Sequence, residues 1–238
     1  MGRFTRDTGY DRKFDKIQGL QWYPYLGEDF KRAGQRIMVF AHNIPVRPKI
    51  FDEKCKEWSG KGTWADAIEE FAYEEARYTR AFRYFVKAAT GLTENYGKDS
   101  RPEITIKVDE FLRRIAFINF IQELVKSEKQ IAQAGPEQVE RSKAVNREIL
   151  NVLGVTHCIC WGKSVYEYVR GIEGFKPIPE TETQYRKKGF ASCTIDVGAG
   201  KQMRCLKIFH PSMPGFRPVQ GAHSIIAGFL TGNQDART

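Results

Sequence analysis

The sequence predicts an α/β fold: a three-layer αβα sandwich with a central, mainly parallel four-stranded sheet. Short apolar runs that suit buried strands alternate along the chain with segments of helical periodicity, and no repeat of fixed period is visible. The chain has 238 residues, of which 41% are hydrophobic, which is enough for one sizeable core. We therefore expect a single domain over residues 1–238.

The first third of the chain contains one strand and one helical region. Residues 1–20 are polar and charged, and we expect them to form a loosely held arm. The apolar run at 36–41 predicts a strand, and Pro45 excludes a helix directly after it. Apolar residues then recur at spacings of three and four, up to Gly91. This pattern predicts a helical insertion over residues 63–90.

The remainder of the chain alternates strands with helices. A second apolar run ends at Asn119. Residues 136–153 form the clearest amphipathic helix, because Pro136 suits its first turn and Gly154 suits its C-terminal cap. The other expected elements are a strand at 157–161, a short helix at 164–169, and a hairpin of strands at 191–197 and 202–209.

The charge of the chain favours an anionic partner. Its 38 Lys and Arg against 29 Asp and Glu give a net charge of +9, which suits nucleic acid, although a solvated basic surface has the same composition. No apolar run reaches the ~18 residues of a membrane span, and the N-terminus lacks the apolar segment of a signal peptide. We expect a cytoplasmic protein without a membrane partner.

The cysteines do not predict a disulfide framework or a metal centre. Their number, five, is odd, and no Cys-x-x-Cys pair occurs. Cys158 and Cys160 alternate on one strand face, while the other three are isolated in the sequence. The four histidines also lack the spacing of metal ligands. We interpret the cysteines as reduced core residues and expect neither metal nor cofactor.

Three segments place polar side chains at the ends of expected strands. They are Ala41-His42-Asn43-Ile44-Pro45, Asn119 at the end of its apolar run, and His210-Pro211-Ser212. In an open α/β sheet, ligands bind at the carboxyl ends of the strands. This order of residues resembles the uracil-DNA glycosylase superfamily, and Trp22-Tyr23-Pro24-Tyr25-Leu26-Gly27 is similar to its compact bacterial members.

The resemblance implies specific roles for these residues. In that family the first motif holds the attacking water, the second carries an Asn that reads the flipped pyrimidine, and the third supplies the catalytic imidazole. The implied catalytic residues are Asn43 and His210, with His42 as a titratable neighbour that can share the role of Asn43. The implied base-binding residues are Asn119, Ala41, Ile44 and Pro45.

Each of these residues also has a structural alternative. Many family members have Asp where this chain has Asn43, and an amide can orient a water but cannot accept its proton. The family's Gly is Ala41 here and its Pro is displaced, so Asn43 can instead close a turn before Pro45. The alternative for Asn119 is a core residue bonded to backbone, and for His210 a core or metal-binding histidine.

Two further segments suit DNA contacts. The loop after His210 offers Met213 and Phe216 as apolar wedges for the gap left by a flipped base, with Ser212 and Arg217 as phosphate or base contacts. Such a Pro- and Gly-rich loop is also typical of a surface turn. Arg77, Arg80 and Arg83 recur at helical spacing and suit a phosphate-tracking face or a solvated one.

The resemblance implies a monofunctional DNA glycosylase that acts on double- or single-stranded DNA as a monomer. The tyrosine that rejects 5-substituents in uracil-specific relatives has no counterpart at Ile44-Pro45-Val46. The expected substrate is therefore a 5-modified pyrimidine, such as the glucosylated hydroxymethylcytosine of phage DNA, or else uracil. One alternative is a non-catalytic binder of uracil-containing or modified DNA. Another alternative is an unrelated α/β nucleotide-binding protein, but the chain lacks the glycine-rich phosphate motifs of that class.

Overall fold

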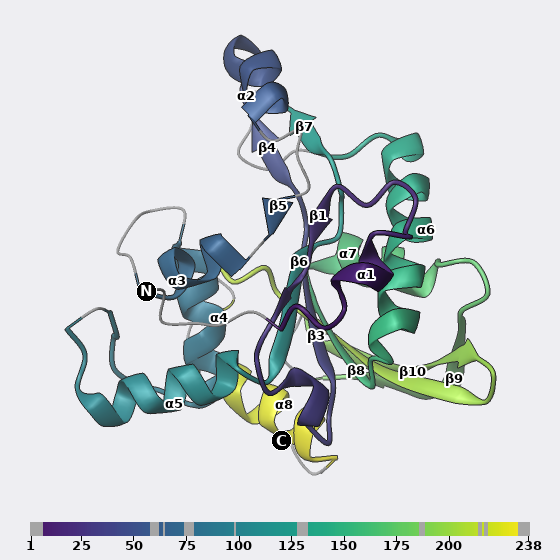
Figure 1. Ribbon diagram of the computed structural model, residues 1–238. Helices are drawn as coiled ribbons and strands as arrows, with labels where there is room; N and C mark the ends of the chain where they lie inside the picture. Colours follow the sequence, from purple (N-terminus) through teal and green to yellow (C-terminus); the bar gives the residue numbers. More distant parts are fainter. Residues whose placement is uncertain are drawn as a thin grey trace.

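A seven-stranded mixed sheet with helices on both faces forms the body of the protein (Figure 1). The computed structural model describes residues 7–57, 62–63, 65–73, 79–97, 99–127, 133–185, 189–213, 216 and 219–232. In spatial order the strands are β2 (Tyr25–Leu26), β6 (Ile115–Asn119), β3 (Ile37–Ala41), β8 (His157–Trp161), β11 (Lys201–Ile208), β10 (Ala191–Gly198) and β9 (Lys176–Gln184). The α/β class is confirmed.

The centre of the sheet is parallel. Strands β6, β3, β8 and β11 pair in that order and run in the same direction. Every residue of β3, β6 and β8 is buried, as expected of strands covered on both faces. The register places Ala41 opposite Asn119, and Ile208 opposite Trp161. The carboxyl ends of these four strands therefore meet at one edge.

The expectation of a mainly parallel four-stranded sheet is wrong. Strand β2 is antiparallel to β6, β10 to β11, and β9 to β10, so the sheet is mixed and larger. The tight turn around Ala199, which has a φ of 52°, reverses the chain between β10 and β11 and makes that pair antiparallel. Strand β2 has only two residues, too few for a periodic signal.

One face of the sheet is covered by two helices that the sequence predicts. Helix α6 spans Pro136–Leu153, with Pro136 in its first turn and Gly154 as a left-handed C-terminal cap at a φ of 58°. Helix α7 spans Lys163–Arg170 and follows β8 directly. Asn146 of α6 donates a hydrogen bond of 2.7 Å to the backbone oxygen of Phe120, which ties this helix to the end of β6.

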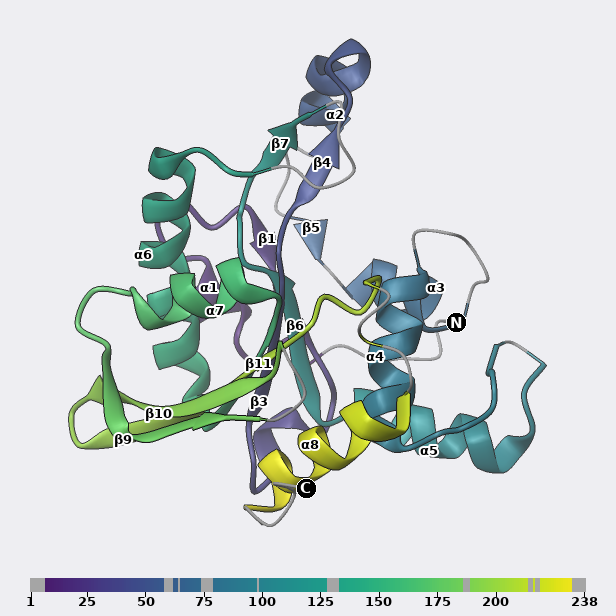
Figure 2. The same cartoon turned by 180° about the vertical axis from the view of Figure 1, so that it is seen from behind.

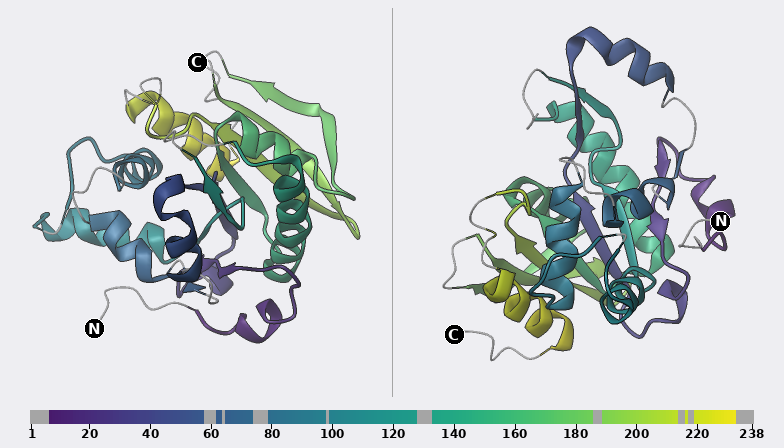
Figure 3. Two further views of the ribbon diagram at one scale, coloured as in Figure 1. Left: turned by 90° about the horizontal axis from the view of Figure 1, so that it is seen from above. Right: turned by 90° about the vertical axis from the view of Figure 1, so that its left-hand side faces the viewer.

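The other face is covered by four helices, towards which Figure 3 (right) looks. They are α3 (Ala65–Tyr73), α4 (Arg80–Thr90), α5 (Pro102–Leu112) and α8 (Val219–Thr231). The ring of Phe82 lies 5.1 Å from that of Phe117, and Phe85 lies 5.3 Å from Trp161. The segment expected as a helical insertion over 63–90 therefore includes two helices, and α4 is part of the layer that buries the sheet.

The expected loose arm is packed over its described part. Helix α1 (Asp11–Phe14) brings Phe14 into the core, where it is fully buried, and Ile17 and Leu20 are buried as well. The expectation is therefore wrong for residues 7–20, because three apolar residues spaced three apart outweigh the polar composition. Residues 1–6 lie outside the described part of the chain.

Two short ribbons complete the fold. Strands β1 (Trp22–Tyr23) and β5 (Gly62–Thr63) pair in parallel, as do β4 (Ile44–Val46) and β7 (Leu124–Lys126). Figures 1 and 2 show β4, β7 and helix α2 (Phe51–Glu57) projecting from the body beyond the carboxyl edge of the parallel strands. Of the helices described, none has the length and apolar character that crossing a membrane requires.

Candidate functional site

The carboxyl edge of the parallel strands carries the polar residues that the sequence singles out. Asn119 is the last residue of β6, His42 follows β3, and His210 lies two residues after β11. Trp161, the last residue of β8, stands between the strands that carry the two histidines. The fold thus brings together three segments separated by more than 70 residues each.

The side chain of Asn119 lacks the bonds of a structural amide. The residue is only 5% exposed, and its backbone oxygen accepts a hydrogen bond of 3.0 Å from Nε2 of Gln122. Its carboxamide makes no hydrogen bond to any described residue. Asn146, by contrast, uses its amide to bind the backbone of Phe120. The Asn119 carboxamide is therefore available to a ligand.

The hydrogen bonds of His210 define its tautomer. Its Nδ1 accepts a hydrogen bond of 3.3 Å from the backbone N–H of Ser212 and lies 2.7 Å from the Ser212 hydroxyl. A ring nitrogen that accepts from an N–H carries a lone pair, so the proton of the neutral ring is on Nε2. That Nε2 has no hydrogen-bond partner among the described residues. His210 therefore offers one N–H donor to a ligand.

Burial keeps the His210 imidazole neutral. Burial, and to a smaller extent the nearby His42, lower the pKa of His210 to about 4. The His210 ring also stands edge-on to Trp161, with 5.7 Å between ring centroids, which fixes its orientation. At neutral pH the ring is thus an uncharged, oriented hydrogen-bond donor.

His42 is held by an aromatic contact. Its ring stacks on Tyr168 of α7, with 6.0 Å between centroids and 19° between planes. Burial lowers the pKa of His42, and its Nε2 is buried without a partner in the described chain. Asn43 follows it and is half-buried. The structure places both beside the edge, and which of them orients a water stays a prediction.

The expected base-binding residues lie around the start of the projecting ribbon. Ala41 is buried opposite Asn119 in the sheet, and Ile44 is half-buried at the start of β4. Pro45 is part of β4, but its side chain lies outside what is described. Ala41 lies two residues before Asn43, the water-holding position implied by the resemblance, and Ile44 and Pro45 directly follow it.

The two expected wedges have different environments. Met213 is 43% exposed, whereas Phe216 is fully buried and belongs to the core. Ser212 is exposed, with its hydroxyl against His210. Arg217 lies outside the described residues. Sequence could not separate Met213 from Phe216, since both are apolar residues of one loop.

The arginines at helical spacing, Arg77, Arg80 and Arg83, do not share one environment. Arg80 is exposed and lies over the Tyr84 ring at 5.7 Å. Arg83 is half-buried, and its guanidinium donates a hydrogen bond of 3.3 Å to the backbone oxygen of Tyr96. Arg77 lies outside the described residues. A role of these arginines in DNA binding stays a prediction, with Arg80 the best exposed of the two described.

Three cysteines that appear unrelated in the sequence cluster in space. The sulfur atoms of Cys158, Cys160 and Cys205 all lie within 4.8 Å of one another, and the three side chains are fully buried. Cys205 pairs with Cys158 in the parallel register of β8 and β11, so sequence spacing alone misses this cluster. Burial raises the pKa of Cys160 and Cys205 well above the ordinary value. Against burial, which raises it, the pKa of Cys158 is instead lowered by its hydrogen bonds with Cys160 and Cys205.

No family model matches the chain, and no curated protein sequence matches it either. The functional interpretation of the edge therefore depends on its chemistry. It combines an unpaired amide, a neutral imidazole with an available N–H, and the aromatic rings of Trp161 and Tyr168.

We expect His210 to stay neutral, with its proton on Nε2, down to about pH 4. Its ordinary pKa is 6.5, so between these values the unfolded chain binds more protons at His210 than the folded protein. The contribution of His210 to stability is therefore complete above pH 6.5 and is lost as the pH falls towards 4. Long-range ¹H–¹⁵N NMR measures the pKa of His210 and identifies which ring nitrogen carries the proton. The signals are assigned by their loss in His210→Gln. A midpoint near 6.5, or a proton on Nδ1, contradicts the assigned geometry.

Proposed function

We propose that the chain is a monofunctional DNA glycosylase, which flips a pyrimidine out of DNA and hydrolyses its N-glycosidic bond to leave an abasic site. The observation that carries this proposal is the pairing, at one sheet edge, of the unsatisfied Asn119 carboxamide with the available Nε2–H of neutral His210. An edge-reading amide and a neutral donor are the two groups that recognition and departure of a pyrimidine require.

His210 stabilises the departing base. As the glycosidic bond breaks, negative charge develops on a carbonyl oxygen of the pyrimidine, and the Nε2–H donates a hydrogen bond to that oxygen. The low pKa of His210 means that this is donation by a neutral ring. A preoriented donor of this kind contributes about 3 kcal/mol to transition-state stabilisation. The contact with Trp161 holds the ring in place, so little reorganisation is needed.

Asn119 reads the base. Its amide supplies one donor and one acceptor, which can match the Watson–Crick edge of a flipped pyrimidine. The residue is nearly buried, so a bound base that fails to pair leaves these groups without a partner. The site discriminates between bases through this cost.

Asn43 orients the attacking water in this mechanism. An amide accepts a hydrogen bond from water without taking its proton, so the base departs first as an anion. The water then bonds to C1′ of the sugar cation, and the proton that it releases neutralises the departed base. His42 is adjacent and has a lowered pKa, so at neutral pH its uncharged ring can share this task. No lysine is assigned to covalent chemistry, and hydrolysis alone is proposed.

The surroundings of the edge suit a nucleic-acid partner. The net charge of +9 favours phosphate backbones, and exposed Met213 adjoins the His210 loop, where a side chain can fill the gap of a flipped base. We propose that the protein acts as a monomer in the cytoplasm on double- or single-stranded DNA. The biological role is either repair of uracil or defence against phage DNA with modified bases.

A non-catalytic binder of modified DNA is the second candidate. The amide at Asn43 permits it, since the best-known members of the family that the chain resembles have a carboxylate there, although other branches have Asn. The oriented neutral donor at His210 favours an enzyme, because a binder has no developing charge to stabilise. Excision of a base distinguishes the two.

The first test is excision by the parent protein and by His210→Ala. We expect abasic sites in at least one of four duplexes, which carry uracil, hydroxymethyluracil, hydroxymethylcytosine or glucosylated hydroxymethylcytosine, and a loss of at least ~100-fold in single-turnover rate for the variant. The matched control is His223→Ala, since His223 bonds to the backbone of Ala88 on another helix. DNA binding without excision by the parent indicates the binder, and equal rates remove His210 from the mechanism.

The second test concerns base reading. Asn119→Ala is expected to lose discrimination between bases, and Asn119→Asp to change which pyrimidine is accepted, because an ionised carboxylate only accepts hydrogen bonds. Excision rates on the same four duplexes measure this. Asn146→Ala serves as the control, since it is expected to lower the free energy of unfolding while the base preference stays as in the parent. If both Asn119 variants keep the base preference of the parent protein, Asn119 is a structural residue and does not read the base.

The third test concerns the missing tyrosine. Pro45→Tyr is expected to depress excision of 5-substituted pyrimidines by at least ~10-fold while uracil excision, where present, is retained. The added ring overlaps a 5-substituent and leaves the edge read by Asn119 untouched. Pro45→Ala separates loss of the proline from gain of the ring. If the parent protein excises uracil strongly and no 5-substituted base, the prediction of a 5-modified substrate is wrong and the function is ordinary uracil repair.

A further inference from the structure

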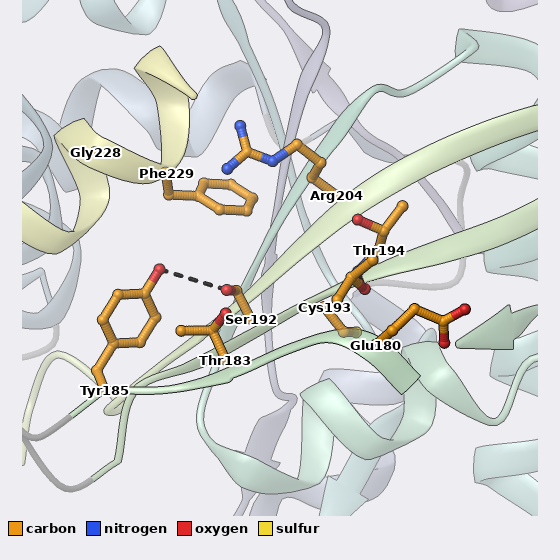
Figure 4. A pocket seen from close by; sticks show the side chains of 10 residues that line it. Glu180, Thr183, Tyr185, Ser192, Cys193, Thr194, Arg204, Gly228 and Phe229 are labelled. Atoms are coloured by element: carbon orange, nitrogen blue, oxygen red, sulfur yellow. Dashed lines mark hydrogen bonds between the residues drawn. The ribbon is translucent and has the colours of Figure 1, made fainter. Parts of the chain in front are cut away.

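A polar cavity lies away from the carboxyl edge. It has a volume of about 170 Å³ and is enclosed by β9, β10, β11 and the last turns of α8 (Figure 4). Its lining includes the hydroxyl groups of Thr183, Tyr185, Ser192 and Thr194. Arg204 and Phe229 also line it. None of these residues belongs to the site proposed for base excision.

Arg204 is the cation of this cavity. It projects from β11 opposite Thr194 of β10, and its guanidinium carbon lies 4.8 Å from the centre of the Phe229 ring. The residue is half-buried, and burial lowers the pKa of Arg204. Within the described chain its guanidinium forms neither an ion pair nor a hydrogen bond. A fork of five N–H donors is thus held in place without a protein acceptor.

The nearby acidic groups do not neutralise this charge. Glu180 lines the opposite end of the cavity, and Figure 4 shows its carboxylate pointing away from the guanidinium. Glu182 forms an ion pair with Arg170. The C-terminal end of α8 lies close and its partial negative charge attracts a cation, but it supplies no hydrogen-bond acceptor to Arg204 among the described residues. Among the described residues the guanidinium thus has no counter-charge, and it is available to bind an anion.

The hydroxyl groups face the same space. The Tyr185 and Ser192 hydroxyl oxygens lie 3.4 Å apart, the Thr183 side chain lies beside Ser192, and Thr194 lies towards Arg204 (Figure 4). A hydroxyl can rotate to donate a hydrogen bond to an oxyanion, and a guanidinium binds two of its oxygens at once. The combination suits a tetrahedral oxyanion better than a planar neutral ligand.

The volume of the cavity limits the size of the ligand. Sites for drug-sized molecules occupy roughly 300–1,000 Å³. At about 170 Å³ this cavity is small for a drug-sized ligand and accommodates a single phosphate-sized group. We propose that the Arg204 cavity binds one phosphate group, either as a free oxyanion or as a terminal phosphate monoester.

The test is titration of the full-length protein with inorganic phosphate by isothermal calorimetry in chloride buffer at constant ionic strength. Saturable binding to the parent is expected, with Arg204→Met weakening it at least tenfold and Ser192→Ala weakening it less. Arg32→Met is the matched control, because exposed Arg32 already pairs with Asp29 and its loss removes the same charge. Arg204→Lys keeps the charge but not the fork and covers the case in which Arg204→Met fails to fold.

Absence of binding to the parent overturns the proposal. So does equal affinity in the parent and in folded Arg204→Met or Arg204→Lys, checked by circular dichroism. Competition then identifies the source of the phosphate group. Displacement by a 5′-phosphorylated oligonucleotide, but not by its unphosphorylated form, identifies a nucleic-acid end, and displacement by neither identifies a free anion; both outcomes support the cavity as the site. The test is independent of base excision.

Discussion

The structure depends on the parallel backbone pairing of β6, β3, β8 and β11. The first three of these strands are buried along their whole length, so their backbone groups must be paired within the sheet. A shift of one residue would also turn each strand's side chains to the opposite face, which fixes the register strongly. With that register, the row that contains Asn119 and Ala41 continues to the ends of β8 and β11. The candidate site is the direct result of this pairing.

Elements with a strong local signal could be predicted from the sequence. Helix α6 has Pro136 and Gly154 at its ends, and the β10–β11 hairpin has a glycine-rich turn, so each boundary depends on neighbouring residues. Strands β2 and β9 could not be predicted in the same way. Strand β2 is only two residues long, and β9 contains Pro177 and Pro179, so both owe their place in the sheet to pairing with distant strands.

The same limit applies to the site. Asn119, His42 and His210 could be predicted to lie at strand ends, because the polar residue directly follows an apolar run. The tautomer of His210, the burial of Phe216 and the engagement of Arg83 with Tyr96 could not, since each depends on contacts made only after folding. The clustering of Cys205 with Cys158 and Cys160 likewise requires the register of two strands 40 residues or more apart.

The electrostatics of the edge favour one type of chemistry. A protonated His210 would be opposed both by burial and by His42, so a cationic imidazole is an unfavourable state of this site at neutral pH. A neutral donor costs less to bury and still stabilises an anion through its N–H, and its strength grows as water leaves the site. The edge therefore suits a reaction in which negative charge develops on the substrate close to the His210 N–H as a bond breaks. It does not suit proton transfer from a histidine. Base departure from a nucleoside, with its anionic pyrimidine, has that charge pattern.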